Sequence, residues 1–274
     1  MKLAPLFLAI LLLALPVQAH EGEESTLEQT LEQAVAANSL NSIMAAASIA
    51  AILVLVSIYK KEKTERQKLA LFLGIAIPVL AATVYTAGGT VYLNLASVSG
   101  GPVHWHADFE IWNCGSKLDL IDPEGLLNRV GTPVFHEHGD DRIHVEGVVT
   151  DLREASLHRF IEFVGGYHDD STLIIPTNEG AVEMRNGDSC NGNPGKLQGF
   201  LFSVNNPSAA MKTGFVFEQT KIQDIGDYVP APYSNIPPGN CIIIEFDQEK
   251  ERTDKICSSY RLAIQKGDLE EEHG

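Results

Sequence analysis

Residues 104–112 read HWHADFEIW, and this alternation decides the fold class of the second half of the chain. Side chains two positions apart in a β-strand point to the same face of the sheet. One face of this segment is apolar and carries Trp105, Ala107, Phe109 and Ile111. The other face is polar and carries His104, His106, Asp108 and Glu110. The segment therefore predicts a strand with a core side and a polar side that presents two histidines.

Strand patterns continue on both sides of a single helical pattern. Apolar residues at helical spacing predict an amphipathic helix over residues 156–164, which ends at Gly165 and Gly166. Further strands are expected at residues 117–121, 134–138, 142–150, 172–175, 181–185, 197–204, 215–218, 241–247 and 256–264. This order predicts a mostly β (α+β) domain over residues 100–265. A β-grasp-like antiparallel sheet with one helix fits it, and a cupredoxin-like sandwich is the alternative. We expect the acidic tail, residues 266–274, to be disordered.

The first part of the chain has the composition of a membrane anchor. Residues 1–19 read as a secretory signal peptide or an uncleaved anchor, and residues 20–42 as a short acidic extracytoplasmic segment. Two uncharged apolar runs follow at residues 43–59 and 69–95, and each is long enough for a transmembrane helix. The loop between them, residues 60–68, is basic and belongs in the cytoplasm by the positive-inside rule. The domain that follows is then an extracytoplasmic domain of an integral membrane protein.

Cysteine usage and charge agree with this placement. All four cysteines lie in the domain placed outside, and an even number in an oxidising compartment predicts two disulfides. Three pairings of Cys114, Cys190, Cys241 and Cys257 are possible. The net charge of −16 excludes a nucleic-acid partner, which would require a basic surface.

Five of the nine histidines fall within residues 104–144. They form two H-x-H pairs and one further position: His104, His106, His136, His138 and His144. In a strand, both rings of an H-x-H pair project from the same face and can converge on one ion. If the three segments are neighbours in one sheet, the five imidazoles share a face. This pattern predicts a metal site.

Imidazole ligands favour a borderline ion, so a copper or zinc ion is the expected cofactor. Three or four of the five histidines are expected to coordinate it, and their identity stays open. Asp108 or Glu146 could lie in the first or second shell. Strand alternation points Glu137 away from His136 and His138, which weakens it as a catalytic group.

Several of these segments resemble a group of poorly characterised archaeal and bacterial membrane-anchored proteins. The resemblance rests on HWHADFEIWNCG, GTPVFHEHGDDRIHVEG, the short helix that ends in Gly-Gly, and PPGNCIIIEFD. It covers about residues 102–265. The group carries H-x-H and I-H-V-E motifs but has no established activity, so the resemblance supports the domain and the histidine site without supplying a reaction.

Three functions are compatible with these features. The first is a membrane-anchored module that binds copper or zinc for metal binding, sensing or delivery. The second is a metal-dependent enzyme on the same histidines, and the third is a metal-free surface interaction or structural domain. No H-E-x-x-H, G-x-S-x-G, P-loop or dinucleotide motif occurs in the sequence, so we assign no catalytic residue and favour a non-enzymatic role. The sequence names no protein partner.

Overall fold

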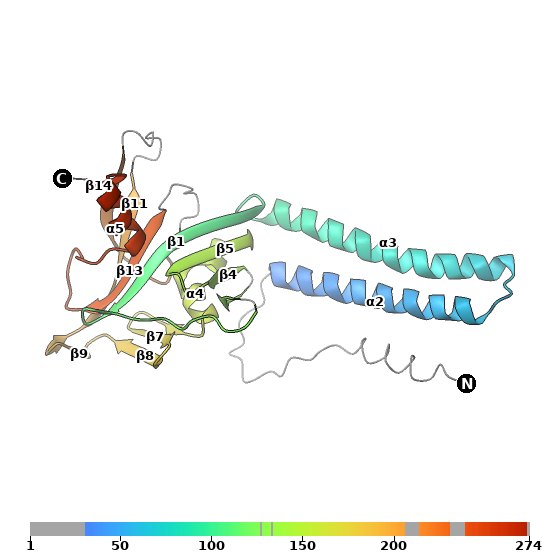
Figure 1. Ribbon diagram of the computed structural model, residues 1–274, viewed down its shortest axis with the longest axis horizontal. Helices are drawn as coiled ribbons and strands as arrows, with labels where there is room; N and C mark the ends of the chain where they lie inside the picture. Colours follow the sequence, from blue (N-terminus) through green and yellow to red (C-terminus); the bar gives the residue numbers. More distant parts are fainter. Residues whose placement is uncertain (1–30, 127, 133, 206–213, 231–238, 273–274) are drawn as a thin grey trace. The chain divides into compact units, whose positions relative to one another are not determined.

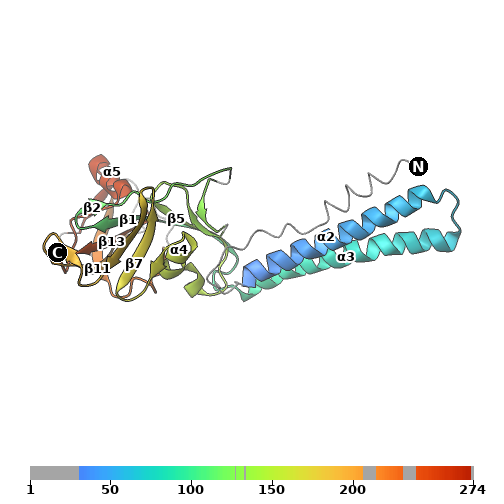
Figure 2. The ribbon, with the colours of Figure 1, turned by 90° about the horizontal axis from the view of Figure 1, so that it is seen from below.

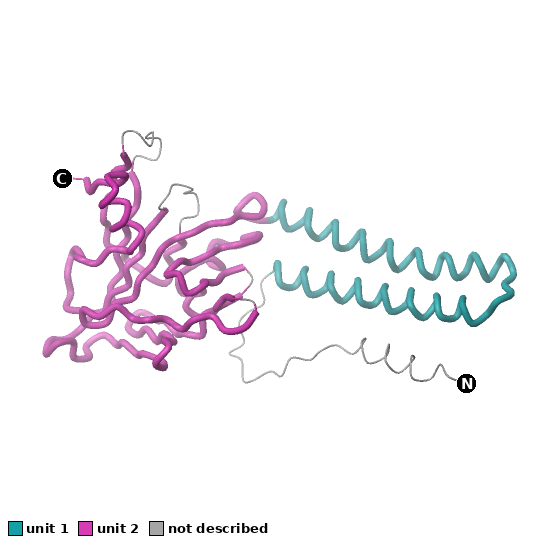
Figure 3. The backbone as a smooth tube through the Cα atoms, viewed as in Figure 1, with its two compact units in different colours: residues 1–96 teal, residues 97–274 magenta. Residues whose placement is uncertain are grey.

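The chain folds into two compact units, residues 1–96 and residues 97–274 (Figures 1, 2 and 3). The predicted signal peptide lies outside the residues that the structure describes. The computed structural model describes residues 31–126, 128–132, 134–205, 214–230 and 239–272.

The first unit contains two helices that are long and apolar enough to cross a membrane. These are α2 (Leu31–Tyr59) and α3 (Glu65–Ala96). Each begins earlier than the apolar run that predicts it, and each is exposed over most of its length. The buried positions include Ala46 on α2 and Ala82 on α3. Small residues let two helix backbones approach closely, as they do in membrane helix pairs.

The second unit is built on a mixed sheet in which nine strands are described. In space the strands run β14-β12-β11-β13-β1-β5-β4-β3, and β2 pairs with β1. Most pairs are antiparallel, but the central pair β1–β13 and the edge pair β12–β14 are parallel. The strands are β1 (Pro102–Asn113), β2 (Ser116–Lys117), β3 (Val130–Gly131), β4 (Phe135–Glu137), β5 (Arg142–Val148), β11 (Lys196–Val204), β12 (Phe215–Ile222), β13 (Asn240–Asp247) and β14 (Leu269–Glu271).

Smaller elements complete this unit. A 3-10 helix, η1 (Leu152–Ala155), leads into the predicted helix, α4 (Leu157–Phe163). A second α-helix, α5 (Ser258–Lys266), follows the last long strand. Two small sheets contain β6 (Tyr167–His168), β7 (Thr172–Thr177), β8 (Gly180–Arg185), β9 (Ser189–Cys190) and β10 (Asn193–Pro194).

The two α-helices of this unit lie on opposite faces of the main sheet (Figure 2). On one face, Phe160 of α4 packs against Phe109 and Phe135, with ring centroids 5.2 Å and 5.3 Å apart. On the other face, Tyr260 of α5 is fully buried against Phe217, with ring centroids 5.4 Å apart. The mostly β architecture predicted from the sequence is therefore confirmed, but the sheet is mixed and carries two helices instead of one.

Two predictions near the C-terminus are wrong. Residues 256–264 were expected to form a strand, but α5 occupies most of them because Tyr260 and Ala263 face the core at helical spacing. The helix ends at Gly267, whose φ of 76° suits a glycine cap. The tail at 266–274 was expected to be disordered, yet Leu269–Glu271 form β14, and Leu269 is 1% exposed.

All four cysteines form disulfides, as predicted. Cys114 pairs with Cys190, and Cys241 pairs with Cys257. The second bond joins β13 to the residue that precedes α5, so it holds this helix on the sheet.

Candidate metal centre

Three adjacent strands bring the histidines into one row. His106 on β1 is the register partner of His144 on β5, and His144 is also the register partner of His136 on β4. His104 lies two residues before His106 on β1, and His138 follows the end of β4. The central position in this row therefore belongs to His144.

The five rings lie close together. The His106 and His138 ring centroids are 4.5 Å and 4.7 Å from that of His144, and the His136 ring stacks parallel to it at 5.4 Å. Within the H-x-H pairs, the centroids are 4.4 Å apart for His104 and His106 and 4.7 Å apart for His136 and His138. We call this set of five residues the histidine face.

The side chains on the opposite face of the same three strands point into the core. Trp105 and Ala107 on β1, Phe135 on β4, and Ile143 and Val145 on β5 are all buried. The alternation predicted for residues 104–112 is therefore confirmed. An apolar layer beneath three paired strands holds the imidazoles above it in a fixed register.

Within the described residues, two groups of three histidines could hold a metal ion. One is His104, His106 and His144, and the other is His136, His138 and His144. In each group the ligand atoms lie within 4.8 Å of one another. Metal–nitrogen bonds of about 2.0–2.1 Å in tetrahedral geometry need ligand nitrogens roughly 3.4 Å apart. Ring rotations that move the nitrogens by roughly 1 Å would bring either group to that spacing.

Burial keeps the central rings uncharged at neutral pH. The pKa of His144 is lowered to about 4, mainly by burial and also by the neighbouring His106, while Asp140 acts against the shift. Burial is also the main cause that lowers the pKa values of His106 and His136. An imidazolium ring has no lone pair free for a cation, so these three uncharged rings are in a form that can bind one.

Several ring nitrogens on this face are buried without a hydrogen-bond partner among the described residues. They are Nε2 of His106, Nδ1 of His136 and both nitrogens of His144. Buried polar atoms in proteins are nearly always hydrogen-bonded, and an unpartnered one calls for an explanation such as an ion. His136 is 2% exposed and His144 is 9% exposed, so these nitrogens belong to enclosed rings.

The outer histidines have partners that orient them. His104 Nε2 lies 3.0 Å from Oε1 of Glu146. Nδ1 of His138 contacts the backbone carbonyl of Asn128 and would donate its proton there. Such contacts fix the tautomer and leave the other nitrogen available as a ligand. Glu146 therefore lies where an outer-shell carboxylate would be expected. The Asn128 carbonyl carried no sequence signal because it is a backbone group in a loop.

The structure places Asp108 outside both histidine groups. Its carboxylate accepts a hydrogen bond from Nε of Arg142 at 2.6 Å and another from the hydroxyl of Ser259 on α5. Asp140, which the sequence analysis did not single out, lies nearer, with Oδ2 3.7 Å from Nε2 of His144. The sequence feature that could have indicated this contact is the position of Asp140 four residues before His144.

Glu137 lies on the core side of β4, as alternation predicts. It is 3% exposed, and its carboxylate accepts a hydrogen bond from the backbone N–H of Gly139. Burial raises the pKa of this carboxyl. It therefore shapes the turn after β4 and does not share a face with the histidines.

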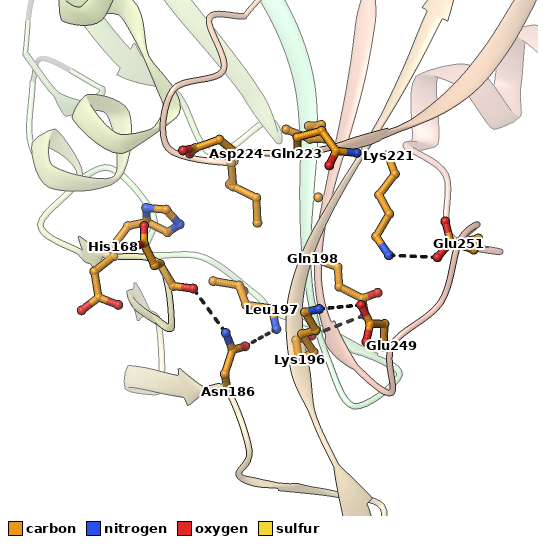
Figure 4. A pocket seen from close by; sticks show the side chains of 15 residues that line it. His168, Asn186, Lys196, Leu197, Gln198, Lys221, Gln223, Asp224, Glu249 and Glu251 are labelled. Carbon is orange, nitrogen blue, oxygen red and sulfur yellow. Dashed lines mark hydrogen bonds and ion pairs between the residues drawn. The ribbon is translucent and has the colours of Figure 1, made fainter.

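Two other described histidines lie on the α4 side of the sheet. His158 on α4 and His168 on β6 have ring centroids 6.1 Å apart, and His158 lies 3.4 Å from Glu162. His168 lines a cavity of about 590 Å³ bounded by β11 and β12 (Figure 4).

The lysines of this cavity are paired with carboxylates. Lys196 contacts Glu249 at 2.5 Å, and Lys221 lies 3.7 Å from Glu251. The charges of these two lysines are therefore offset by neighbouring carboxylates.

Comparisons with known protein families, curated proteins and solved structures find no match for this chain.

Proposed function

We propose that this protein is an integral membrane protein whose extracytoplasmic domain binds copper or zinc through the histidine face, for metal binding, sensing or delivery. The observation that carries the proposal is the row of three register-paired histidines, His106, His144 and His136, with unpartnered buried nitrogens. Neutral imidazoles arranged in this way suit borderline divalent ions such as Cu(II) and Zn(II).

The proposed topology has two transmembrane helices and a cytoplasmic basic loop. The apolar length of α2 and α3 supports it, as does the cluster of lysines and arginine at residues 60–68. Two disulfides in the second unit support an oxidising compartment for that unit. Protease added to intact cells should remove residues 97–274, and protection of that part would contradict the topology.

Two finer assignments are also proposals. The likeness to the poorly characterised membrane-anchored group rests on the sequence alone, on the H-x-H and I-H-V-E segments, the short helix that ends in Gly-Gly, and PPGNCIIIEFD. A β-grasp-like domain is supported by the parallel central pair β1–β13 with α4 packed across one face. The second helix, α5, is an addition to that plan.

Metal binding is favoured over the enzyme alternative because Glu137, the carboxyl group between His136 and His138 in sequence, lies on the core side of its strand. The direct test uses the full chain in detergent micelles, without a histidine tag, dialysed against Cu(II) or Zn(II) at pH 7. Elemental analysis should find bound metal with a dissociation constant below micromolar. His144→Ala should abolish it, while His158→Ala should leave it intact. Binding weaker than micromolar, or binding that His144→Ala does not affect, would contradict the proposal. The hypothesis of a metal-free interaction domain would then be preferred.

A further inference from the structure

The two candidate ligand groups on the histidine face share one residue, His144. The remaining ligands divide by strand, with His104 and His106 on β1 and His136 and His138 at β4. Because β5 lies between β1 and β4, the His144 ring has a histidine partner on each side. One ion at either group would leave the other pair of imidazoles without a metal.

His144 also differs from the outer histidines in its hydrogen bonding. A histidine that binds one metal ion through one nitrogen almost always donates the other N–H to a carboxylate, a carbonyl or water. His104 and His138 have such partners in Glu146 and the Asn128 carbonyl. Both nitrogens of His144 are buried without one among the described residues, and the nearest carboxylate, Asp140, is 3.7 Å from Nε2. The ring is therefore set up to bind through both nitrogens.

We propose that the histidine face binds two divalent ions and that His144 bridges them as an imidazolate, with Nδ1 on one ion and Nε2 on the other. This inference rests on the proposed metal-binding function. The first ion takes the lone pair of neutral His144 together with one H-x-H pair. The second ion replaces the remaining ring proton, which leaves to bulk water, and binds the other H-x-H pair. No electron is transferred, and both ions keep their charge.

Nearby anionic groups offset the added positive charge. The bridge itself carries one negative charge, Glu146 lies beside His104, and Asp140 lies beside His144. The whole chain has a net charge of −16, which favours the accumulation of cations. Copper and zinc are both suited to imidazole ligands, so the ion class is that of the proposed function.

Copper stoichiometry and electron paramagnetic resonance of the full-length protein test the bridge. The untagged chain in detergent micelles should bind two Cu(II) per chain. Imidazolate couples two Cu(II) spins antiferromagnetically, so the integrated signal at low temperature should fall well below two spins. Two bound ions with a full two-spin signal would overturn the bridge. One bound ion would overturn the two-ion site and leave the proposed function standing. No bound ion would overturn both.

Paired variants then assign the two halves. His104→Ala with His106→Ala should leave one Cu(II) with a full one-spin signal, and so should His136→Ala with His138→Ala. His158→Ala is the matched control and should keep two ions and the weakened signal. If either double variant keeps both ions, or if one of them loses both while its far-ultraviolet circular dichroism matches wild type, the assignment is wrong. The wild-type measurement decides the bridge even if a variant fails to fold.

Discussion

Strand β1 lies between β13 and β5 in the sheet, and the polar side chains at its two ends have different surroundings. At one end, Asp108 and Glu110 bond to α5, through the hydroxyl of Ser259 and the backbone N–H of Ser258. At the other end, His104 and His106 belong to the histidine face and lie outside the apolar cluster around α5. We call the end of β1 that α5 covers the closed end, and the end that carries His104 and His106 the open end.

This contrast suggests that one end of β1 contributes mainly to stability and the other mainly to metal binding. The closed end has an apolar cluster centred on Tyr260 and a disulfide. The hydroxyl of Tyr260 donates to the backbone carbonyls of Phe202 and Gly239. The open end has buried nitrogens that lack partners among the described residues. Changes at the closed end should alter the free energy of unfolding, and changes at the open end should alter metal binding.

The largest effect on the free energy of unfolding is expected from truncating the buried aromatic ring at the closed end. Tyr260→Ala removes a fully buried ring and should lower the free energy of unfolding by about 3–5 kcal/mol. Denaturant unfolding of the purified chain measures it. Leu262→Ala, at a half-exposed position on the same helix, is the control and should change stability by less than about 0.5 kcal/mol. Equal losses in the two variants would mean that α5 does not pack as described.

Removal of the disulfide beside α5 should have the next largest effect. The double variant Cys241→Ala, Cys257→Ala opens a loop with a sequence separation of 16 and should cost about 3 kcal/mol. Metal stoichiometry should not change, because the bond lies at the closed end. Elemental analysis beside a thermal melt checks both points. A folded double variant that has lost its metal would show that the two ends are not independent.

A smaller effect is expected from the partner of His104. Glu146→Gln removes the charge beside Nε2 of that histidine and should weaken metal affinity by about 10–100-fold, as loss of an outer-shell carboxylate typically does. Competition titration with a chromophoric chelator measures it. Glu183→Gln breaks a surface pair with Arg185 on β8 and is the matched control. Indistinguishable affinities for the two variants would remove Glu146 from the site.

The smallest effect concerns pH and the metal-free protein. His144 takes up a proton near pH 4 when folded and near its ordinary value of 6.5 when unfolded. Between these values the unfolded chain binds more protons, so the free energy of unfolding should fall as the pH drops from 6.5 to about 4. His144→Gln cannot titrate and should reduce this slope, whereas His158→Gln should keep it. Chelator-treated protein unfolded by urea across this range gives the slopes, and an undiminished slope in His144→Gln would contradict the burial of the ring.

Local patterns carried much of the fold prediction. The alternation in residues 104–112 and the helix that ends at Gly165 both depend on side-chain period, which a sequence displays directly. The turn at Cys114 and Gly115 joins β1 to β2, and both residues have positive φ, 50° and 87°. The C-terminal helix was missed because Tyr260, Leu262 and Ile264 also alternate, so its period was ambiguous.

Features that depend on long-range pairing could not be predicted. The sequence indicated five clustered histidines, but the central position of His144 follows from the order of β1, β5 and β4 and from their register. The disulfide pairing likewise depends on which strands are neighbours. Register is set by packing across the whole sheet, so a single segment does not reveal it.

X-ray absorption at the copper or zinc edge tests the central claim most directly, because it reports the atoms bound to the ion. The full-length untagged chain loaded with metal should give a first shell of three or four nitrogens at about 2.0–2.1 Å. Outer-shell scattering should carry the signature of imidazole rings, and His144→Ala should lose it. A shell of oxygen ligands alone, or a spectrum that His144→Ala leaves unchanged, would contradict the assignment of the histidine face as the metal centre.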